Sequence, residues 1–282
     1  TGTYAPNANT LNAIYTPSVA EITAGTVALT LTTTGNGNCN SELDNMTITI
    51  TPAPTADAGS NQILCANNSN ATLAGAITVA TGGVWSGGGG SFNPSNTSLN
   101  AIYTPSAREV AAGNVILTLI TTGNAICNAV TDNIQLTFTL PPTADAGVDQ
   151  ILCSNNADIT LIGSVSIATG GQWTGGLGVF TPNSSDLNAV YTPTTGELAA
   201  GSVTLTLTTT GNGNCTPEVD DMTVAFTPNP IVDADIDQTV CANNPTVTLN
   251  GSVVIATGGV WSGGTGTYAP NANTLNAIYT PS

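Results

Sequence analysis

The chain has 282 residues, of which seventeen are acidic and one is basic, and its formal net charge is -16 at pH 7. It contains no lysine and no histidine, and Arg108 is its single basic residue. These absences exclude Ser-His-Asp and Cys-His nucleophiles, imidazole metal ligands, and cationic surfaces for nucleic acid or anionic lipid. We therefore expect that the chain is not an enzyme and has no catalytic residues.

Hydrophobic residues make up 40% of the chain and charged residues only 6%. This composition is richer in apolar side chains and poorer in charge than a disordered polymer, so it favours folded domains with cores. No apolar run approaches the roughly 18 residues of a membrane span, and no charged N-terminal region precedes an apolar segment. We expect a soluble segment that does not insert into a membrane.

An internal repeat organises the whole chain. The cysteines form two series with a step of 88 residues, and the same step relates the tryptophans and one series of tyrosines. The members are Cys39, Cys127 and Cys215; Cys65, Cys153 and Cys241; Trp85, Trp173 and Trp261; and Tyr15, Tyr103, Tyr191 and Tyr279. One unit therefore spans 88 residues.

Proline-rich segments at 51–54, 141–142 and 228–230 mark the junctions between units. They divide the chain into the C-terminal part of a repeat at 1–54, complete repeats at 55–142 and 143–230, and the N-terminal part of a repeat at 231–282. Residues 1–18 are identical to residues 265–282. This identity favours a segment of a longer, near-periodic array. The alternative is a filament subunit whose broken repeats are completed by strand exchange with neighbouring copies.

In chain order, the repeat at 143–230 predicts strands at 149–153, 158–163, 172–174, 178–181 and 187–192, one helical turn at 196–200, and longer strands at 203–208 and 222–227. The two longer segments alternate apolar and polar residues, which is typical of strands with one buried face. Clusters of Gly, Asn, Pro and Ser between the segments supply turns. About seven strands per repeat predict an all-β fold of tandem Ig-like Greek-key β-sandwich domains.

A single tryptophan recurs on the third predicted strand of the repeat. We interpret Trp85, Trp173 and Trp261 as core aromatic residues that fill the space between two sheets. The alternative is an exposed platform on which sugars stack, and it would make the repeats carbohydrate-binding modules.

The cysteines predict disulfides, because no CxxC motif and no histidine is present to form a zinc site. Pairing within a repeat joins Cys65 to Cys127 and Cys153 to Cys215, and leaves Cys39 and Cys241 with partners outside this chain. Pairing across junctions joins Cys39 to Cys65, Cys127 to Cys153 and Cys215 to Cys241. Loop-closure entropy does not separate the two schemes. We favour pairing within a repeat, because we expect the two cysteines that flank a junction to lie nearly a domain length apart.

Acidic residues cluster at the junctions, where carboxylate oxygens would suit calcium. The calcium candidates are Asp145, Asp149, Asp233, Asp235 and Asp237. The first complete repeat has only Asp57 and Asn61 in this stretch, and no EF-hand pattern occurs. We therefore expect solvated or turn-capping acids and no cofactor, with calcium as the alternative.

Several strings resemble a known family. ADAGVDQILC at 144–153, TLIGS at 160–164 and TTTGNGNC at 208–215 are similar to PKD-like and Ig-like tandem repeats of Bacteroidota cell-surface proteins. The blocks GGxW(S/T)GG and LNAxYTP resemble the arrays of the SprB-type gliding-motility adhesin. The resemblance implies long surface filaments with no catalytic residues, and it implies paired cysteines at Cys65, Cys127, Cys153 and Cys215.

These observations lead to a functional hypothesis. We expect a secreted, extracellular stalk segment of a cell-surface adhesive filament that serves attachment or gliding motility. Its expected partners are the neighbouring repeats of the same chain and surface glycans or other cell-surface polymers, and not nucleic acid. The alternatives are carbohydrate-binding adhesin modules and a self-assembling filament subunit.

Overall fold

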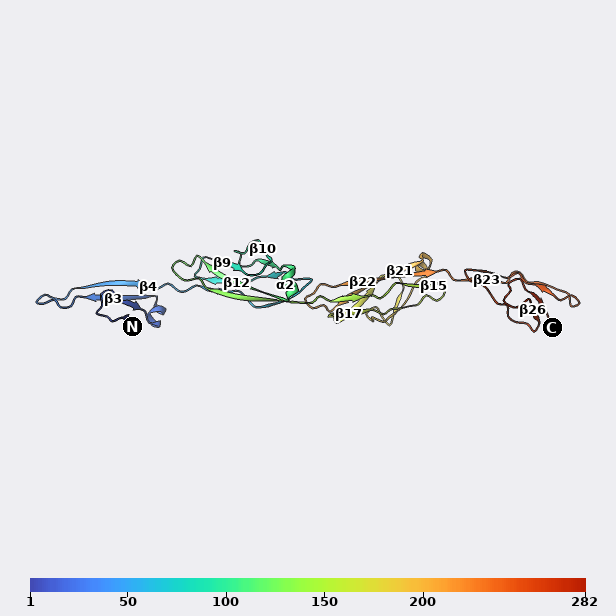
Figure 1. Ribbon diagram of the computed structural model, residues 1–282, viewed down its shortest axis with the longest axis horizontal. Helices are drawn as coiled ribbons and strands as arrows, with labels where there is room; N and C mark the ends of the chain where they lie inside the picture. Colours follow the sequence, from blue (N-terminus) through green and yellow to red (C-terminus); the bar gives the residue numbers. More distant parts are fainter. The chain divides into compact units, whose positions relative to one another are not determined.

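A computed structural model describes residues 1–282, whose regular secondary structure is mostly strands, with three short helices (Figure 1). The chain divides into two compact units, Thr1–Leu140 and Pro141–Ser282. Each unit contains one complete copy of the 88-residue repeat and one partial copy, except that residues 141–142 of the first complete repeat fall in the second unit. The predicted all-β fold is confirmed.

The first complete repeat contains nine strands and one helix. They are β5 (Thr55–Asp57), β6 (Gln62–Cys65), β7 (Ala71–Thr72), β8 (Ala76–Thr78), β9 (Gly82–Ser86), β10 (Ser91–Asn93), β11 (Ile102–Thr104), α2 (Ala107–Ala112), β12 (Asn114–Thr122) and β13 (Thr131–Thr139). One sheet has the order β6-β13-β12-β9, a second has the order β10-β11-β7, and β5 pairs with β8. The two larger sheets match the two sheets of an Ig-type Greek-key sandwich.

The two long strands form the centre of the four-stranded sheet. In β12 and β13, alternate residues are buried, as the period-two pattern predicts. The register places Val115 opposite Leu136 and Leu117 opposite Ile134 in an antiparallel pair. At the edge, β6 runs parallel to β13, so that Cys65 lies opposite Thr139 near the end of the last strand.

Each complete repeat has its own hydrophobic core. In the first, Trp85 packs with Leu117, Leu119, Ile134 and Leu136, all of which are buried. Burying such side chains contributes about 1.5–3 kcal/mol each. The core also explains Gly75, because a Cβ atom there would lie 2.8 Å from Cζ2 of the tryptophan ring.

The second complete repeat has the same elements at the 88-residue step. They are β14 (Thr143–Asp145), β15 (Gln150–Cys153), β16 (Ile159–Thr160), β17 (Ser164–Ser166), β18 (Gly170–Thr174), β19 (Val179–Thr181), β20 (Val190–Thr192), α3 (Thr195–Ala200), β21 (Ser202–Thr210) and β22 (Val219–Thr227). The sheet orders repeat as β15-β22-β21-β18, β16-β20-β19 and β14-β17. Trp173, Leu205, Leu207, Met222 and Val224 form the equivalent core.

The partial repeats contain subsets of these elements. Residues 1–54 form β1 (Thr3–Ala5), β2 (Ile14–Thr16), α1 (Val19–Ala24), β3 (Thr26–Thr32) and β4 (Leu43–Thr49). Residues 231–282 form β23 (Ile231–Asp233), β24 (Val247–Thr248), β25 (Ser252–Val254), β26 (Thr267–Ala269) and β27 (Ile278–Thr280). The first set corresponds to the second half of a sandwich, and the second set corresponds to the first half.

The three helices share one local design. Ser18, Ser106 and Thr194 cap their N-termini, and each is followed three residues later by a glutamate that completes a capping box. A glycine with positive φ ends each helix, as at Gly113, where φ is 82°. Each helix is six residues long, and none has the length and apolar character needed to cross a membrane.

Candidate functional sites

The tryptophans are core residues in the complete repeats. Trp85 and Trp173 are fully buried, and their indole Nε1 atoms donate hydrogen bonds to the carbonyl oxygens of Leu99 and Leu187 at 3.3 and 3.2 Å. Trp261 lies in a partial repeat and is half-buried. The two buried rings have no exposed face on which a sugar could stack.

A tyrosine and a glutamate form the most extensive polar network of each repeat. In the first complete repeat, Tyr103 on β11 donates a hydrogen bond of 2.8 Å to the Glu109 carboxylate on α2. That carboxylate also accepts hydrogen bonds from the main-chain N–H groups of Gly89 and Ser106, both at 2.7 Å, and from the Ser106 hydroxyl. The tyrosine oxygen accepts from the Gly90 N–H at 3.0 Å.

The second repeat reproduces this network. Tyr191 donates to Glu197 at 2.6 Å, and the carboxylate accepts from the N–H groups of Leu177 and Thr194, both at 2.7 Å, and from the Thr194 hydroxyl. The network thus joins the β18–β19 turn, strand β20 and the start of α3. It fixes the segment that leads into the long strand β21.

The network shifts the pKa values of both partners. Desolvation raises the pKa of the Glu109 and Glu197 carboxyls, but the hydrogen bonds from the tyrosine, the helix cap and the turn outweigh it and lower each pKa to about 2. Burial, and then the bond to the glutamate, raises the pKa of Tyr103 and Tyr191 to about 12. The network is therefore a charged carboxylate held by neutral donors over most of the pH range.

Sequence reasoning missed this network, although a signal for it is present. The spacing Ser/Thr-x-x-Glu at 106–109 and 194–197 is a capping-box pattern. The tyrosine stands three residues before each cap.

The structure places the two cysteine series at opposite ends of a sandwich. Cys65 ends β6 opposite Thr139, and its Sγ lies 3.8 Å from the Leu140 carbonyl oxygen. Cys127 lies in the connection before β13, which begins at Thr131. Thr131 and Thr139 are the two ends of this nine-residue strand, which are roughly 26 Å apart.

This geometry corrects the predicted pairing within a repeat. A disulfide needs Cα atoms within about 7 Å, so Cys65 cannot reach Cys127. The same register separates Cys153, opposite Thr227, from Cys215, which precedes the start of β22 at Val219. We had expected the second cysteine of a repeat to lie within reach of the first, but the β12–β13 connection carries Cys127 to the end of the sandwich opposite Cys65.

The pairing across junctions that was the alternative is also wrong. Cys39, Cys127, Cys153 and Cys241 are free thiols. Cys65 and Cys215 are disulfide-bonded residues. Neither predicted scheme leaves this combination of bonded and free cysteines.

The calcium candidates accept hydrogen bonds from neighbouring groups. The side chains of Asp145 and Asp233 accept from the N–H groups two residues further on, at 2.9 Å each, and Asp149 accepts from the Thr223 N–H at 2.8 Å. Asp235 accepts from the Asn250 side chain at 3.2 Å, and Asp237 is exposed. No group of three or more acids or cysteines with metal-binding geometry is present. The hydrogen-bonded acids act as turn and strand acceptors.

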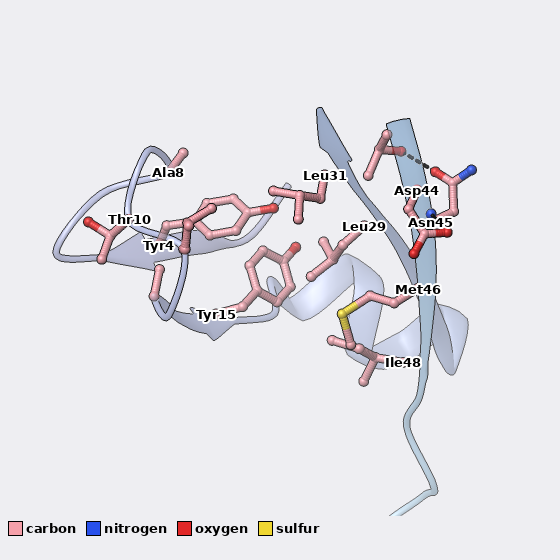
Figure 2. A pocket seen from close by; sticks show the side chains of 13 residues that line it. Tyr4, Ala8, Thr10, Tyr15, Leu29, Leu31, Asp44, Asn45, Met46 and Ile48 are labelled. Atoms are coloured by element: carbon pink, nitrogen blue, oxygen red, sulfur yellow. Dashed lines mark hydrogen bonds between the residues drawn. The ribbon is translucent and has the colours of Figure 1, made fainter. Parts of the chain in front are cut away.

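An open apolar groove of about 460 Å³ lies in the partial repeat at the N-terminus. Figure 2 shows Leu29 and Leu31 from β3, Met46 from β4 and the ring of Tyr15 turned toward it. The equivalent leucines of the first complete repeat, Leu117 and Leu119, are buried against Trp85. The groove therefore corresponds to the half of the core that the first strands of a complete repeat cover.

Comparisons with known proteins give structural neighbours only. No family model and no curated protein matches the chain. Cadherin domains 1–4 of protocadherin gamma B7 align with 96% of this chain and 79% of that chain, at 10% identity and a TM-score of 0.36. Mouse cadherin-23 EC22–24 aligns with 81% and 86% of the two chains, at 14% identity and a TM-score of 0.32.

The insect immune protein hemolin is a further neighbour, described with implications for homophilic adhesion. It aligns with 71% of this chain and 56% of that chain, at 10% identity and a TM-score of 0.35. These neighbours are tandem cadherin and Ig-type domains of adhesion proteins. At such identities and scores they carry no argument about activity, and the fold assignment rests on the strands and cores described above.

Proposed function

We propose that this chain is a structural segment of a long extracellular adhesive filament, built from tandem β-sandwich repeats. The observation that carries the proposal is that both complete repeats have separate cores of equivalent residues. The stability of such an array is approximately a sum over repeats and their neighbours, so its length grows with copy number. A stalk that presents a binding tip away from a cell needs a length that can increase in this way.

Charge and junction composition support the same function. A net charge of -16 with one basic residue discourages lateral association of neighbouring filaments. The proline-rich segments at 51–54, 141–142 and 228–230 restrict the bending of the chain between repeats. The resemblance of the repeat strings to gliding-motility adhesins extends the proposal to surface attachment or gliding on the outside of a bacterial cell.

Single-molecule pulling tests the structural role. We expect the reduced protein to unfold in separate events for its two complete sandwiches, with equal increments. Each 88-residue repeat corresponds to an extended contour of roughly 30 nm. One cooperative event for the whole chain would contradict independent, serially linked repeats.

Carbohydrate binding through the tryptophans has little support, because Trp85 and Trp173 are buried. A glycan array probed with the intact chain, followed by titration of sugars while tryptophan fluorescence is recorded, tests this alternative. We expect no glycan to quench tryptophan fluorescence, and quenching by a sugar would require an opened core.

Self-assembly by strand exchange has one observation in its favour. The groove at Leu29, Leu31 and Met46 is an uncovered half-core, and residues 231–264 of a second copy correspond to the strands that cover it in a complete repeat. Sedimentation velocity over a hundredfold concentration range tests this alternative. Chain growth that Leu31→Asp abolishes would favour it, and a constant monomer would exclude it.

A further inference from the structure

Cysteines of the two series lie beside the same position of the repeat. Leu140 and Pro228 are equivalent residues at the ends of the two complete repeats, and Pro52 is the equivalent residue one repeat earlier. Cys65 Sγ lies 3.8 Å from the Leu140 carbonyl oxygen, and Cys153 Sγ lies 3.9 Å from that of Pro228. The Cys65 series therefore marks the end of its own repeat.

The other series marks the end of the preceding repeat. Cys127 Sγ lies 3.7 Å from the carbonyl oxygen of Pro52 and 3.5 Å from the hydroxyl oxygen of Thr51. Both of these residues precede the first strand of the repeat that contains Cys127. The β12–β13 connection thus carries its cysteine back to the junction.

We propose that consecutive repeats are joined by a disulfide between the cysteine that ends the β6-type strand of one repeat and the cysteine in the long-hairpin connection of the next. In this chain the rule pairs Cys65 with Cys215, which stand 150 residues apart. Leu140, beside Cys65, stands at the same repeat position as Pro52, beside which the hairpin cysteine Cys127 lies. The disulfide-bonded state of Cys65 and Cys215 agrees with this pairing.

The same rule explains the four free thiols. By this rule, Cys153 and Cys241 would each supply the N-terminal cysteine of a bond, and Cys39 and Cys127 would each supply the C-terminal cysteine. Their partners would stand 150 residues further along or back, at positions outside the numbered chain. Each repeat of an array that follows this rule is bonded to both of its neighbours.

The bond requires an external disulfide as oxidant. The Cys215 thiolate attacks oxidised glutathione and releases one glutathione thiolate. The Cys65 thiolate then attacks the mixed disulfide at the Cys215 sulfur and releases the second. Two protein thiols lose two electrons and two protons, and one glutathione disulfide becomes two thiols.

The mechanical effect of this pairing differs from that of a disulfide within one domain. Residues 66–214 lie inside the loop that the bond closes, so tension applied at the chain ends bypasses them. Extended fully, these 149 residues would add roughly 50 nm of contour. In a longer array the next bond that does not overlap this one begins at Cys241, so the 25 residues 216–240 separate one closed loop from the next.

Peptide mapping of the intact chain tests the pairing. The protein is oxidised with glutathione disulfide, alkylated under denaturing conditions without reductant and digested with pepsin. We expect one crosslinked pair of peptides that contains Cys65 and Cys215, and alkylated Cys39, Cys127, Cys153 and Cys241. A Cys65–Cys127 or Cys153–Cys215 crosslink, or six alkylated cysteines, would overturn the proposal.

Pulling at constant force gives an independent readout. When the oxidised protein is held at constant force, a reductant should release residues 66–214 to the load, and their unfolding should lengthen the molecule by roughly 50 nm. Cys215→Ser should remove this step, and Cys39→Ser, which changes an exposed free thiol, should keep it. A step near 20 nm, as expected for a loop of 61 residues closed within one repeat, would contradict the proposed register.

These measurements do not depend on the proposed adhesive role. A chain with the Cys65–Cys215 bond whose reduced form unfolds in one cooperative event would disprove the proposed stalk function and leave the bond in place. A chain with independently unfolding repeats and unbonded sulfurs would do the reverse.

Discussion

The Tyr191 hydroxyl donates a 2.6 Å hydrogen bond to the Glu197 carboxylate, and this contact joins strand β20 to helix α3 in the second complete repeat. Tyr103 and Glu109 make the same contact at 2.8 Å in the first complete repeat, and Tyr15 and Glu21 make it at 2.8 Å in the partial repeat at 1–54. Phe180 supports the tyrosine ring, with ring centroids 4.8 Å apart. Three copies of one network in one chain indicate that it is part of how the repeat folds.

Removing the charge from this network should destabilise the repeat. We expect Glu197→Gln to lower the free energy of unfolding by about 1–3 kcal/mol, because an amide replaces a carboxylate that accepts four hydrogen bonds. Urea unfolding followed by tryptophan fluorescence measures the change. Asp237→Asn, which removes the same charge from an exposed side chain, should leave stability within about 0.5 kcal/mol. An equal loss in both variants would mean that net charge, and not the network, is responsible.

The network also predicts how stability depends on pH. The Glu197 pKa is about 2 in the folded chain, below its ordinary value of 4.5, so its stabilising contribution is present above pH 4.5 and is lost as the pH falls toward 2. The Tyr191 pKa is raised from 10.0 to about 12, so its contribution is present below pH 10 and is lost as the pH rises toward 12. Thermal melts between pH 2 and 12 measure both limbs. Glu197→Gln should flatten the acidic limb, and an acidic limb unchanged by this substitution would contradict the assignment.

Two glycines of the second repeat should respond in opposite ways to alanine. At Gly178, a Cβ atom would collide with the Thr192 carbonyl oxygen and lie 2.8 Å from Cζ of the Tyr191 ring, so Gly178→Ala should destabilise the repeat by about 2 kcal/mol or more. At Gly196 in α3, the nearest atom would be 3.8 Å away, so Gly196→Ala should stabilise the chain by about 0.5–1 kcal/mol through helix propensity. Urea midpoints compare the two variants. Stabilisation by both would show that the turn before β19 yields without cost.

Sequence reasoning succeeded where the signal is local. The period-two alternation of 203–208 and 222–227 predicted β21 and β22, and the turn predicted at 196–200 is α3. It missed β14 and β17, because three-residue strands carry too few residues for a pattern. It also failed for the cysteines, because their separation depends on the parallel pairing of β15 with β22, which sequence spacing does not encode.

Removal of divalent cations should leave the melting transition unchanged. The side chains of Asp145, Asp149 and Asp233 already accept hydrogen bonds from main-chain N–H groups. Carboxylates that satisfy turn and strand donors have fewer oxygens available for calcium, which takes six to eight oxygen ligands. Differential scanning calorimetry with excess EDTA and with excess calcium compares the two states. A transition that rises with calcium and falls with EDTA would show that these junction acids bind the ion.

A pair of equivalent leucines tests whether the core energy of a complete repeat is absent from a partial one. Leu207 on β21 is 0% exposed, whereas Leu31, at the same repeat position on β3, is 60% exposed. Leu207→Ala should cost about 2–5 kcal/mol, because it removes buried methyl groups and leaves a cavity beside Trp173. Leu31→Ala should cost less than about 0.5 kcal/mol in the isolated chain, because its side chain has little apolar contact to lose. Urea unfolding of both variants measures the difference. A large cost for Leu31→Ala would mean that the groove of the partial repeat is covered in solution, and sedimentation would then identify a second copy as the covering chain.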